Sequence, residues 1–383
     1  MQYPLTVSRR QAVLDLLFAL LGERASIVAE ESIGHKWAPV TRLTFDREIP
    51  GVGWTAVVKT RRVDHDGWGG PAHLRREQAG LRTAEPANVA PRLIASDDST
   101  GVVLAADLGR WPTLESVLIG NNGDAAASAM ISVGESVGRL HAATLHAETL
   151  HQERLGVTDS RPDRLGQWPG VDRWHDVEVA SAELGFPDAS MAREDVAFVL
   201  DRLSQPSPFA ALVHMDLNPA NVLVTADGVK LVDFEGSAYG HIGVDVSFLH
   251  YPFPNYSSHW ATLPREVVIE ADRAYREELA RTLPFAAFAS YHEMLAIGAA
   301  AALAVRVQRL RKLAEHGQPP DDRWRRRAQL VQQIRVFEQL AGAAGCLPSL
   351  AEWFTRLADA MAHRWQDATT PPPPLFPAFH AST

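Results

Sequence analysis

Four polar residues in the second half of the chain have types and a spacing that could support phosphoryl transfer. The segment LVHMDLNPANVLV places His214, Asp216 and Asn221 in the pattern H-x-D-x-x-x-x-N, and GVKLVDFEG brings Asp233 about a dozen residues later. Phosphoryl transfer needs a carboxylate that orients and deprotonates a hydroxyl, and oxygen ligands for magnesium. A loop with Asp216 and Asn221 five positions apart could supply both, and Asp233 would follow a hairpin strand. The alternative is a polar loop before an ordinary hairpin.

Two charged residues nearer the N-terminus could complete such a site. Lys59 lies near the end of the alternating run WTAVVKT, which predicts a strand, and Glu77 lies in the charged helical pattern HLRREQAGLR. Taken alone, Lys59 is typical of a solvated strand lysine, and Glu77 of a surface charge that pairs with nearby arginines. The order along the chain, a strand lysine, a helix glutamate and then the Asp216 loop, favours a functional interpretation of both.

Together these motifs resemble the aminoglycoside phosphotransferase and choline kinase-like families, which are relatives of the protein kinases. The resemblance implies that Asp216 is the catalytic base and that Asn221 and Asp233 bind Mg²⁺. It also implies that Lys59 holds the α- and β-phosphates of ATP while it pairs with Glu77. It covers roughly residues 26–249.

The same resemblance implies a nucleotide side of the site. The run GVVLAADLG is similar to the strand and hinge that join the two lobes, where adenine would bond main-chain groups of Ala105, Ala106 and Asp107. Leu223 and Val232 would lie near the adenine. The alternative for the hinge segment is an ordinary buried strand that ends in a glycine turn.

Three residues have supporting interpretations. His214 would brace the catalytic loop, and Asp245 in GHIGVDVSFL matches an aspartate that braces the same loop in these families. A helix cap is the alternative for Asp245. The words GRLHAAT recur in aminoglycoside phosphotransferase-like chains, and their helix is expected to be a packing helix with His141 at the core or its boundary.

The chain departs from protein kinases at several points. It has no G-x-G-x-x-G loop; ESIGHKWAPVT occupies that place, so residues 32–36 could cover the phosphates or form a plain hairpin turn. Glu235 replaces the glycine of D-F-G, and no A-P-E segment follows. These departures favour a small-molecule enzyme. Glu235 could contact the acceptor or a second metal, or it could be a solvent-facing turn residue.

The acceptor pocket is expected in the helical lobe. Aromatic faces suit sugar rings and quaternary ammonium groups, although aromatic side chains in a helical lobe more often belong to the core. The candidate walls are Trp168, Trp174, Tyr239, His250, Tyr251, Tyr256 and Trp260.

The elements that must position these residues predict an α+β, bilobal, protein kinase-like fold. An N-terminal lobe, 1–107, would combine a helix at 8–21, a small antiparallel sheet and one main helix at 72–84. A mostly helical lobe, 108–368, would carry the catalytic loop and the acceptor site. A proline-rich tail, 369–383, should be extended and lie outside the core. The strands are expected at 26–33, 40–45, 54–60, 92–95, 101–106, 211–213 and 221–233, and the later helices at 124–150, 192–203, 264–283, 291–316, 322–344 and 350–365.

Composition limits the class of protein. A formal net charge of -9 disfavours nucleic acid as a partner. The single cysteine, Cys346, cannot form an intrachain disulfide, and no Cys/His set has zinc-ligand spacing. The apolar run 294–305 is too short to span a bilayer, which needs roughly 20 residues, so a buried helix and a cytoplasmic protein are expected.

The predicted function is transfer of a phosphoryl group from ATP, with Mg²⁺, to a hydroxyl of a small molecule. An aminoglycoside, an amino alcohol and a sugar are all open as acceptors. Two other functions remain alternatives: a catalytically silent nucleotide-binding or scaffold protein of the same fold, and, less favoured, a protein kinase. The sequence makes no prediction of the oligomeric state.

Overall fold

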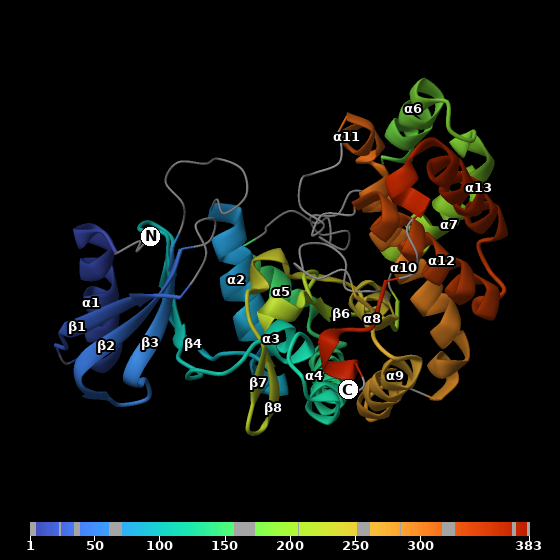
Figure 1. The fold of residues 1–383 in the computed structure, drawn as a ribbon. Helices are drawn as coiled ribbons and strands as arrows, with labels where there is room; N and C mark the ends of the chain where they lie inside the picture. The colour runs from blue at the N-terminus through green and yellow to red at the C-terminus, as the bar shows by residue number, and fades with distance from the viewer. Residues whose placement is uncertain are drawn as a thin grey trace.

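The chain folds into a small sheet-containing lobe and a larger helical lobe (Figure 1). This computed structural model describes residues 5–22, 24–33, 39–60, 71–156, 173–205, 207–250, 261–283, 285–315, 326–369 and 373–380. The expected bilobal α+β, protein kinase-like architecture is confirmed.

The N-terminal lobe is built on a five-stranded antiparallel sheet in the order β1-β2-β3-β5-β4. Helix α1 (Val7–Leu21) packs its apolar side chains on one face of this sheet, in a core that includes Val13, Leu17 and Val58. Thr6 caps the first turn of α1, and Gly22 ends it with φ 67°, a left-handed conformation that glycine adopts without strain. The strands are β1 (Ile27–Ser32), β2 (Val40–Ile49), β3 (Gly53–Thr60), β4 (Leu93–Asp97) and β5 (Val102–Ala106).

Helix α2 (Pro71–Ala84) lies between the sheet and the helical lobe (Figure 1). It contacts β4 and β5 on one side and the turn after Asp233 on the other. Leu74 and Leu81 of α2 belong to the same core cluster as Val213 and Phe234 of the helical lobe. This shared apolar core fixes the position of α2 relative to both lobes.

The helical lobe has a second core, formed by α6, α7, α10, α12 and α13 around the fully buried Trp353. Two short strand pairs carry the polar motifs: β6 (Ala210–Val213) pairs with β9 (Ala238–His241), and β7 (Val222–Thr225) pairs with β8 (Gly228–Leu231). The helices are α3 (Leu114–Leu118), α4 (Gly123–Thr144), α5 (Glu148–Leu155), α6 (Trp174–Leu184), α7 (Arg193–Ser204), α8 (Gly243–His250), α9 (Arg265–Leu279), α10 (Tyr291–Val307), α11 (Leu310–Glu315), α12 (Arg326–Ala344) and α13 (Pro348–Arg364).

The most apolar stretch of the chain is a core helix, as expected. Phe288–Val307, which contains α10, is long and apolar enough to cross a bilayer, but 67% of its most apolar window is buried inside the molecule. Gly298 lets α10 approach Gly243 of α8 so closely that an added Cβ would lie 2.0 Å from the Gly243 carbonyl carbon. Packing against protein therefore accounts for its composition.

One long helix predicted from the sequence forms two separate helices in the structure. The segment 124–150 divides into α4 and α5 because the Thr144 hydroxyl donates to the Leu140 carbonyl at 2.7 Å and accepts from the Leu212 N–H at 3.1 Å. A side chain that bonds the backbone in this way competes with continuation of the helix. The segment 291–316 likewise divides, into α10 and α11, and α3, α6 and β9 were not predicted.

The prediction that the proline-rich tail lies outside the core is wrong. The Thr262 N–H donates to the Pro374 carbonyl at 2.8 Å, and the Phe376 N–H donates back to the Thr262 carbonyl at 3.0 Å. Phe376 is 1% exposed, and the short helix Pro377–Phe379 packs beside α3 and α4. Burial of one phenylalanine contributes about 1.5–3 kcal/mol toward holding this segment against the helical lobe.

Candidate active site

Lys59 is the centre of a buried charge cluster between the lobes. Its Nζ lies 3.2 Å from Glu77 Oε2 and 2.8 Å from Glu235 Oε2, and it also donates to Asp233 Oδ1. The Lys59 side chain is 10% exposed, and those of Glu77 and Glu235 are 7% and 10% exposed. The structure therefore brings together the strand lysine, the helix glutamate and the aspartate of the D-F-E motif, as predicted.

A close approach between α2 and the Asp233 turn makes this cluster possible. A Cβ added at Gly80 of α2 would lie 2.4 Å from Ser237 Oγ and 3.0 Å from Phe234 Cβ. Only glycine fits there, one helical turn after Glu77. Asp233 itself has φ 71° and ψ 61°, a left-handed conformation that costs a non-glycine residue of order 1–3 kcal/mol. That cost is typical of residues whose geometry serves a function.

Asp216 and Asn221 face each other across the catalytic loop. Asn221 Nδ2 donates to Asp216 Oδ2 at 3.0 Å and to the Asp216 carbonyl at 3.1 Å. The loop enters the short helix Pro219–Asn221, which Asn218 caps through a bond to the Ala220 N–H. These contacts hold the Asn221 amide beside the Asp216 carboxylate, five positions earlier in the sequence, as the motif predicts.

Asp245 holds the start of the catalytic loop. Its two carboxylate oxygens accept the N–H groups of His214 at 2.6 Å and Met215 at 2.9 Å. Met215 has φ 69°, so this left-handed residue is fixed by a buried carboxylate. The predicted bracing contacts are present, although Asp245 also lies in the first turn of α8. His214 Nε2 lies 3.0 Å from the Val232 carbonyl and links the loop to the residue that follows β8.

The bracing extends to two residues that the sequence did not single out for this purpose. His141 Nε2 lies 3.3 Å from Asp245 Oδ2, and the Tyr275 hydroxyl lies 2.9 Å from His141 Nδ1. A neutral His141 protonated on Nε2 satisfies every member of this chain: Tyr275 donates to His141, and His141 donates to Asp245. All three side chains are buried, so the catalytic loop is connected to α4 and α9 by a fully bonded polar chain.

Replacing His141 by alanine is expected to reduce turnover by roughly 10- to 100-fold, because the loop that carries Asp216 loses part of its support. Affinity for Mg·ATP should change much less. His151, which is also buried but bonds Thr83, provides a matched histidine-to-alanine control. Steady-state kinetics and calorimetry make the comparison; equal losses of turnover in the two variants would contradict the bracing role of His141.

The environment shifts the pKa values of the acidic residues in different directions. Burial, with repulsion from Asp233, raises the pKa of Asp216 to about 7. Burial also acts to raise the pKa of Asp233, but the charge and hydrogen bond of Lys59 outweigh it and leave that pKa below its usual value. Burial likewise raises the pKa of Glu77 to about 7, against the opposing charge of Lys59. Near neutral pH the Asp216 carboxyl is therefore close to its pKa, while Asp233 stays ionised.

The shift at Asp216 predicts a pH-dependent stability difference. Because its pKa is higher in the folded chain than the usual value of 3.8, ionising Asp216 destabilises the fold increasingly as the pH rises from about 4 to about 7. Asp216→Asn cannot ionise and keeps the side-chain volume. Without nucleotide or metal, its melting temperature should exceed that of the wild type at about pH 8 and converge on it toward about pH 4. A difference that is constant over this range would contradict the raised pKa.

The residues present fit a magnesium site. Mg²⁺ is usually bound by one or two protein oxygens together with substrate phosphates. Asp233 offers an ionised carboxylate, and both hydrogen bonds of the Asn221 amide leave from Nδ2, so that its Oδ1 makes none among the described residues. In the described part of the chain no group of three or more His, Cys, Asp or Glu side chains could hold a metal by itself. A site completed by a nucleotide agrees with both findings.

The predicted nucleotide side is arranged around the connection between the lobes. Ala105 pairs with Val57 of β3 inside the sheet, and the Ala106 N–H donates to the Arg92 carbonyl at 2.8 Å. The Ala106 N–H is therefore not available to adenine, and the predicted contact of this segment must use other main-chain groups. Asp107 follows β5, and its carboxylate binds Arg42.

Leu223 and Val232 lie on the hairpin that follows the catalytic loop. Leu223 pairs with Lys230 and bridges Thr113, just beyond the connection between the lobes, and the Val232 N–H donates to the Asn221 carbonyl at 2.9 Å. Both side chains are half-buried. Their proximity to the base stays a prediction.

Other expectations have mixed outcomes. Glu235 is buried against Lys59, so its interpretation as a solvent-facing turn residue is wrong. Trp174 and Tyr239 are core residues, since Trp174 packs on Trp353 and the Tyr239 hydroxyl donates to the Leu145 carbonyl. His250 bonds Asp272. The calls at Gly34 to Lys36, Trp168, Tyr251, Tyr256 and Trp260 lie outside the described residues.

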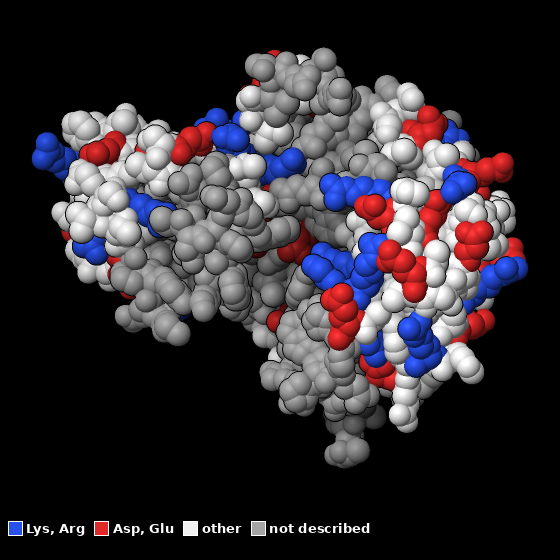
Figure 2. Space-filling model, turned by 90° about the horizontal axis from the view of Figure 1, so that it is seen from above, with Lys and Arg blue, Asp and Glu red and all other residues white. Residues whose placement is uncertain are grey.

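The absence of a nucleic-acid partner stays a prediction. Figure 2 shows basic and acidic side chains interleaved over the helical lobe on the face in view, without a continuous basic stripe among the described residues there.

Comparison with known proteins identifies a family for this chain. The model of the "Phosphotransferase enzyme family" matches residues 41–294, and no curated protein sequence matches. Among solved structures, a "putative aminoglycoside phosphotransferase" from Ralstonia eutropha JMP134 is 14% identical, with TM-score 0.51, and the match covers 90% of this chain and 98% of that chain. A choline/ethanolamine kinase family protein from Mesorhizobium loti is 18% identical (TM-score 0.49; 91% and 98% covered), and the streptomycin–ATP–APH(2″)-IIa complex is 12% identical (TM-score 0.48; 82% and 94% covered). At 14% identity the first of these structures, the one with a TM-score above 0.5, supports the fold alone. The family match spans two thirds of the chain and every residue of the cluster from Lys59 to Asp245, so the chain belongs to the phosphotransferase enzyme family.

Proposed function

We propose that the chain transfers the γ-phosphoryl group of ATP to a hydroxyl of a small molecule. The observation that carries the proposal is the convergence of Lys59 and Asp233, 174 residues apart in sequence, beside a loop that holds Asp216 against Asn221. The negative charges of Asp233 and Glu235 both raise the pKa of Asp216, which supports assigning the two halves to one site. Family membership supports the same reaction class.

Each residue has a role that its environment suits. Asp216 accepts the proton of the acceptor hydroxyl, for which a pKa of about 7 is well placed. Lys59 keeps its positive charge: burial acts to lower its pKa, but Asp233, Glu77 and Glu235 outweigh this and raise it well above the usual value. A permanently charged Lys59 can bind the phosphates of ATP while Glu77 holds its position.

Magnesium, when bound by Asp233 and Asn221, would neutralise charge on the transferring phosphoryl group. Glu235 adds another carboxylate to this region. It lies near enough to share Lys59 with Asp233, so it is a candidate for binding a second cation or a cationic group of the acceptor. These protein groups do no covalent chemistry; they orient the reactants and balance charge.

A small acceptor fits the chain better than a protein substrate. The sequence lacks the activation-segment signature of protein kinases, and Glu235 takes the place of the D-F-G glycine. Neutral or cationic hydroxyl compounds, such as aminoglycosides, amino alcohols and sugars, suit the buried carboxylates and the net charge of -9. A cytoplasmic location and the absence of membrane and nucleic-acid partners belong to the same proposal.

A coupled assay of ADP release tests the proposal. Purified protein with Mg²⁺ and ATP is screened over aminoglycosides, amino alcohols, sugars and nucleosides, with water alone and a generic protein substrate as controls. At least one hydroxyl compound should raise ADP release above the water background, and chelation of Mg²⁺ should abolish the increase. Tight Mg·ATP binding with no transfer to any member of the panel would instead favour a catalytically silent nucleotide-binding protein.

A further inference from the structure

Arg42 lies on the same face of the N-terminal sheet as Lys59. Strand pairing sets Arg42 opposite Val57 and Val57 opposite Ala105, and Lys59 is two residues beyond Val57 on β3. Because side chains of a strand alternate between faces, all four share one face. The opposite face packs in the core with α1 through Leu43, Ala56, Val58 and Leu104. Arg42 is therefore displaced from Lys59 along the cleft face toward the connection between the lobes.

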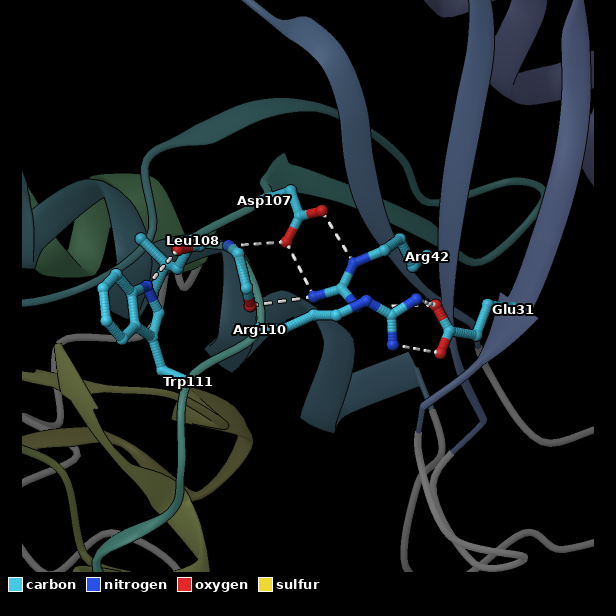
Figure 3. Close-up of polar contacts among 7 residues, drawn as sticks. Glu31, Arg42, Asp107, Leu108, Arg110 and Trp111 are labelled. Atoms are coloured by element: carbon cyan, nitrogen blue, oxygen red, sulfur yellow. Dashed lines mark hydrogen bonds and ion pairs between the residues drawn. The ribbon is translucent and has the colours of Figure 1, made fainter.

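Arg42 binds this connection with a fork of hydrogen bonds (Figure 3). Its Nε donates to Asp107 Oδ2 at 2.7 Å, and its Nη2 donates to Asp107 Oδ1 at 3.0 Å and to the Gly109 carbonyl at 2.8 Å. Asp107 Oδ1 also accepts the Gly109 N–H at 2.9 Å. The Asp107 side chain is 6% exposed and that of Arg42 is 11% exposed. Bidentate, largely buried arginine–carboxylate pairs are strong and geometrically specific.

Further bonds complete the fixation of residues 106–109. The Ala106 N–H donates to the Arg92 carbonyl at 2.8 Å, and the Leu108 carbonyl accepts a hydrogen bond from Trp111 Nε1 at 2.7 Å. Arg92 and Trp111 thus bind two main-chain groups of this segment that Arg42 does not bind. A segment held in this way presents its remaining main-chain groups in one arrangement, which lowers the entropic cost of binding a ligand.

A second ion pair at the same place differs in exposure. Arg110 Nη1 donates to Glu31 Oε1 at 2.7 Å, but the side chains of Arg110 and Glu31 are 72% and 40% exposed. Exposed pairs of this kind contribute about 0–1 kcal/mol. Figure 3 shows both pairs side by side, from β1 and β2 to the connection, and Glu31 Oε2 also lies 3.5 Å from Arg42 Nη1. Arg110 therefore serves as a control for charge at this location without the fixed geometry of Arg42.

We propose that the Arg42–Asp107 pair positions residues 106–109 for recognition of the base of the nucleotide. This inference rests on the proposed function. Lys59 occupies the phosphate end of the cleft face, and the connection fixed by Arg42 lies at the other end, so the two residues govern different parts of one ligand. Loss of Arg42 should weaken binding through the base and spare binding through the phosphates. Arg42 is a positioning residue, because it acts through the backbone that it holds.

Calorimetric titration of three probes separates the two ends of the site. Mg·ATP contains base and phosphates, adenosine contains only the base end, and Mg·tripolyphosphate contains only the phosphate end. Arg42→Ala should weaken Mg·ATP and adenosine by about tenfold or more, as expected for loss of a charged hydrogen-bonded pair, while Mg·tripolyphosphate stays within about twofold. Arg110→Ala should leave all three within about twofold. Lys59→Met should weaken Mg·ATP and Mg·tripolyphosphate and spare adenosine.

Two further variants keep the inference testable if Arg42→Ala does not fold. Arg42→Lys keeps the charge but cannot form the fork, so it should show the same selective loss to a smaller degree. Asp107→Asn should also weaken ATP, and the double variant Arg42→Lys with Asp107→Asn should be less impaired than the sum of the single changes. Equal weakening of tripolyphosphate and adenosine, or unchanged ATP binding, overturns the inference while the proposed function stands. A wild-type protein that binds none of the three probes overturns both.

Discussion

Alanine at position 216 is expected to lower turnover by about 10²- to 10⁴-fold, the range that general-base catalysis contributes. The carboxylate of Asp216 is the group whose pKa of about 7 allows it to take a proton from a hydroxyl at neutral pH. Its partner Asn221 bonds both the side chain and the backbone of residue 216, so the loop keeps the Asn221–backbone contact in the variant. Affinity for Mg·ATP should therefore change by no more than about threefold.

Steady-state kinetics with an acceptor from the ADP-release screen measures the turnover, and calorimetry measures the affinity. Asp227→Ala is the matched control, because Asp227 is an exposed aspartate on the turn of the next hairpin. It should retain wild-type turnover. If Asp216→Ala also retained full turnover, the assignment of the base would be wrong, whatever the nucleotide affinity.

Asp233→Asn is expected to reduce turnover by roughly 10²- to 10³-fold for a different reason, the loss of an ionised oxygen ligand at the phosphate end. The Mg²⁺ concentration required for half-maximal ATP binding should rise strongly, since one of two protein ligands loses its charge. Lys59 keeps ion pairs with Glu77 and Glu235, so the fold should remain intact.

The measurement is ATP binding as a function of Mg²⁺ concentration, with melting temperature as the check on folding. Asp216→Ala provides an internal comparison: it should leave the Mg²⁺ dependence unchanged although its turnover is also low. A variant Asp233→Asn with the Mg²⁺ dependence of the wild type would show that residue 233 does not bind the metal.

Part of the site could be predicted because its geometry is local. His214, Asp216 and Asn221 lie within eight residues, so a single loop sets their arrangement, and the motif alone indicates which groups face one another. The contact between Lys59 and Asp233 joins residues 174 positions apart. No periodicity predicts such a contact, and the resemblance to a known family implied only that both residues belong to one nucleotide site.

The residues that the sequence did not reveal depend on long-range packing. The Arg42–Asp107 pair spans 65 positions, and the chain from Tyr275 through His141 to Asp245 joins three helices. The burial of Glu235 follows from the close approach of α2 at Gly80. The pattern of charges along one segment cannot predict this approach. The predicted end of the helix 124–150 was wrong for a related reason. Helix α4 ends at Thr144, whose hydroxyl accepts a hydrogen bond from Leu212 in strand β6.

The most direct measurement is a crystal structure with Mg²⁺ and a non-hydrolysable ATP analogue. We expect one cation bound by Asp233 and by Oδ1 of Asn221 at about 2.0–2.1 Å, with Lys59 Nζ on the phosphates and Asp216 facing the γ-phosphate. An analogue bound away from the space between these side chains, or a cation that neither residue touches, would contradict it.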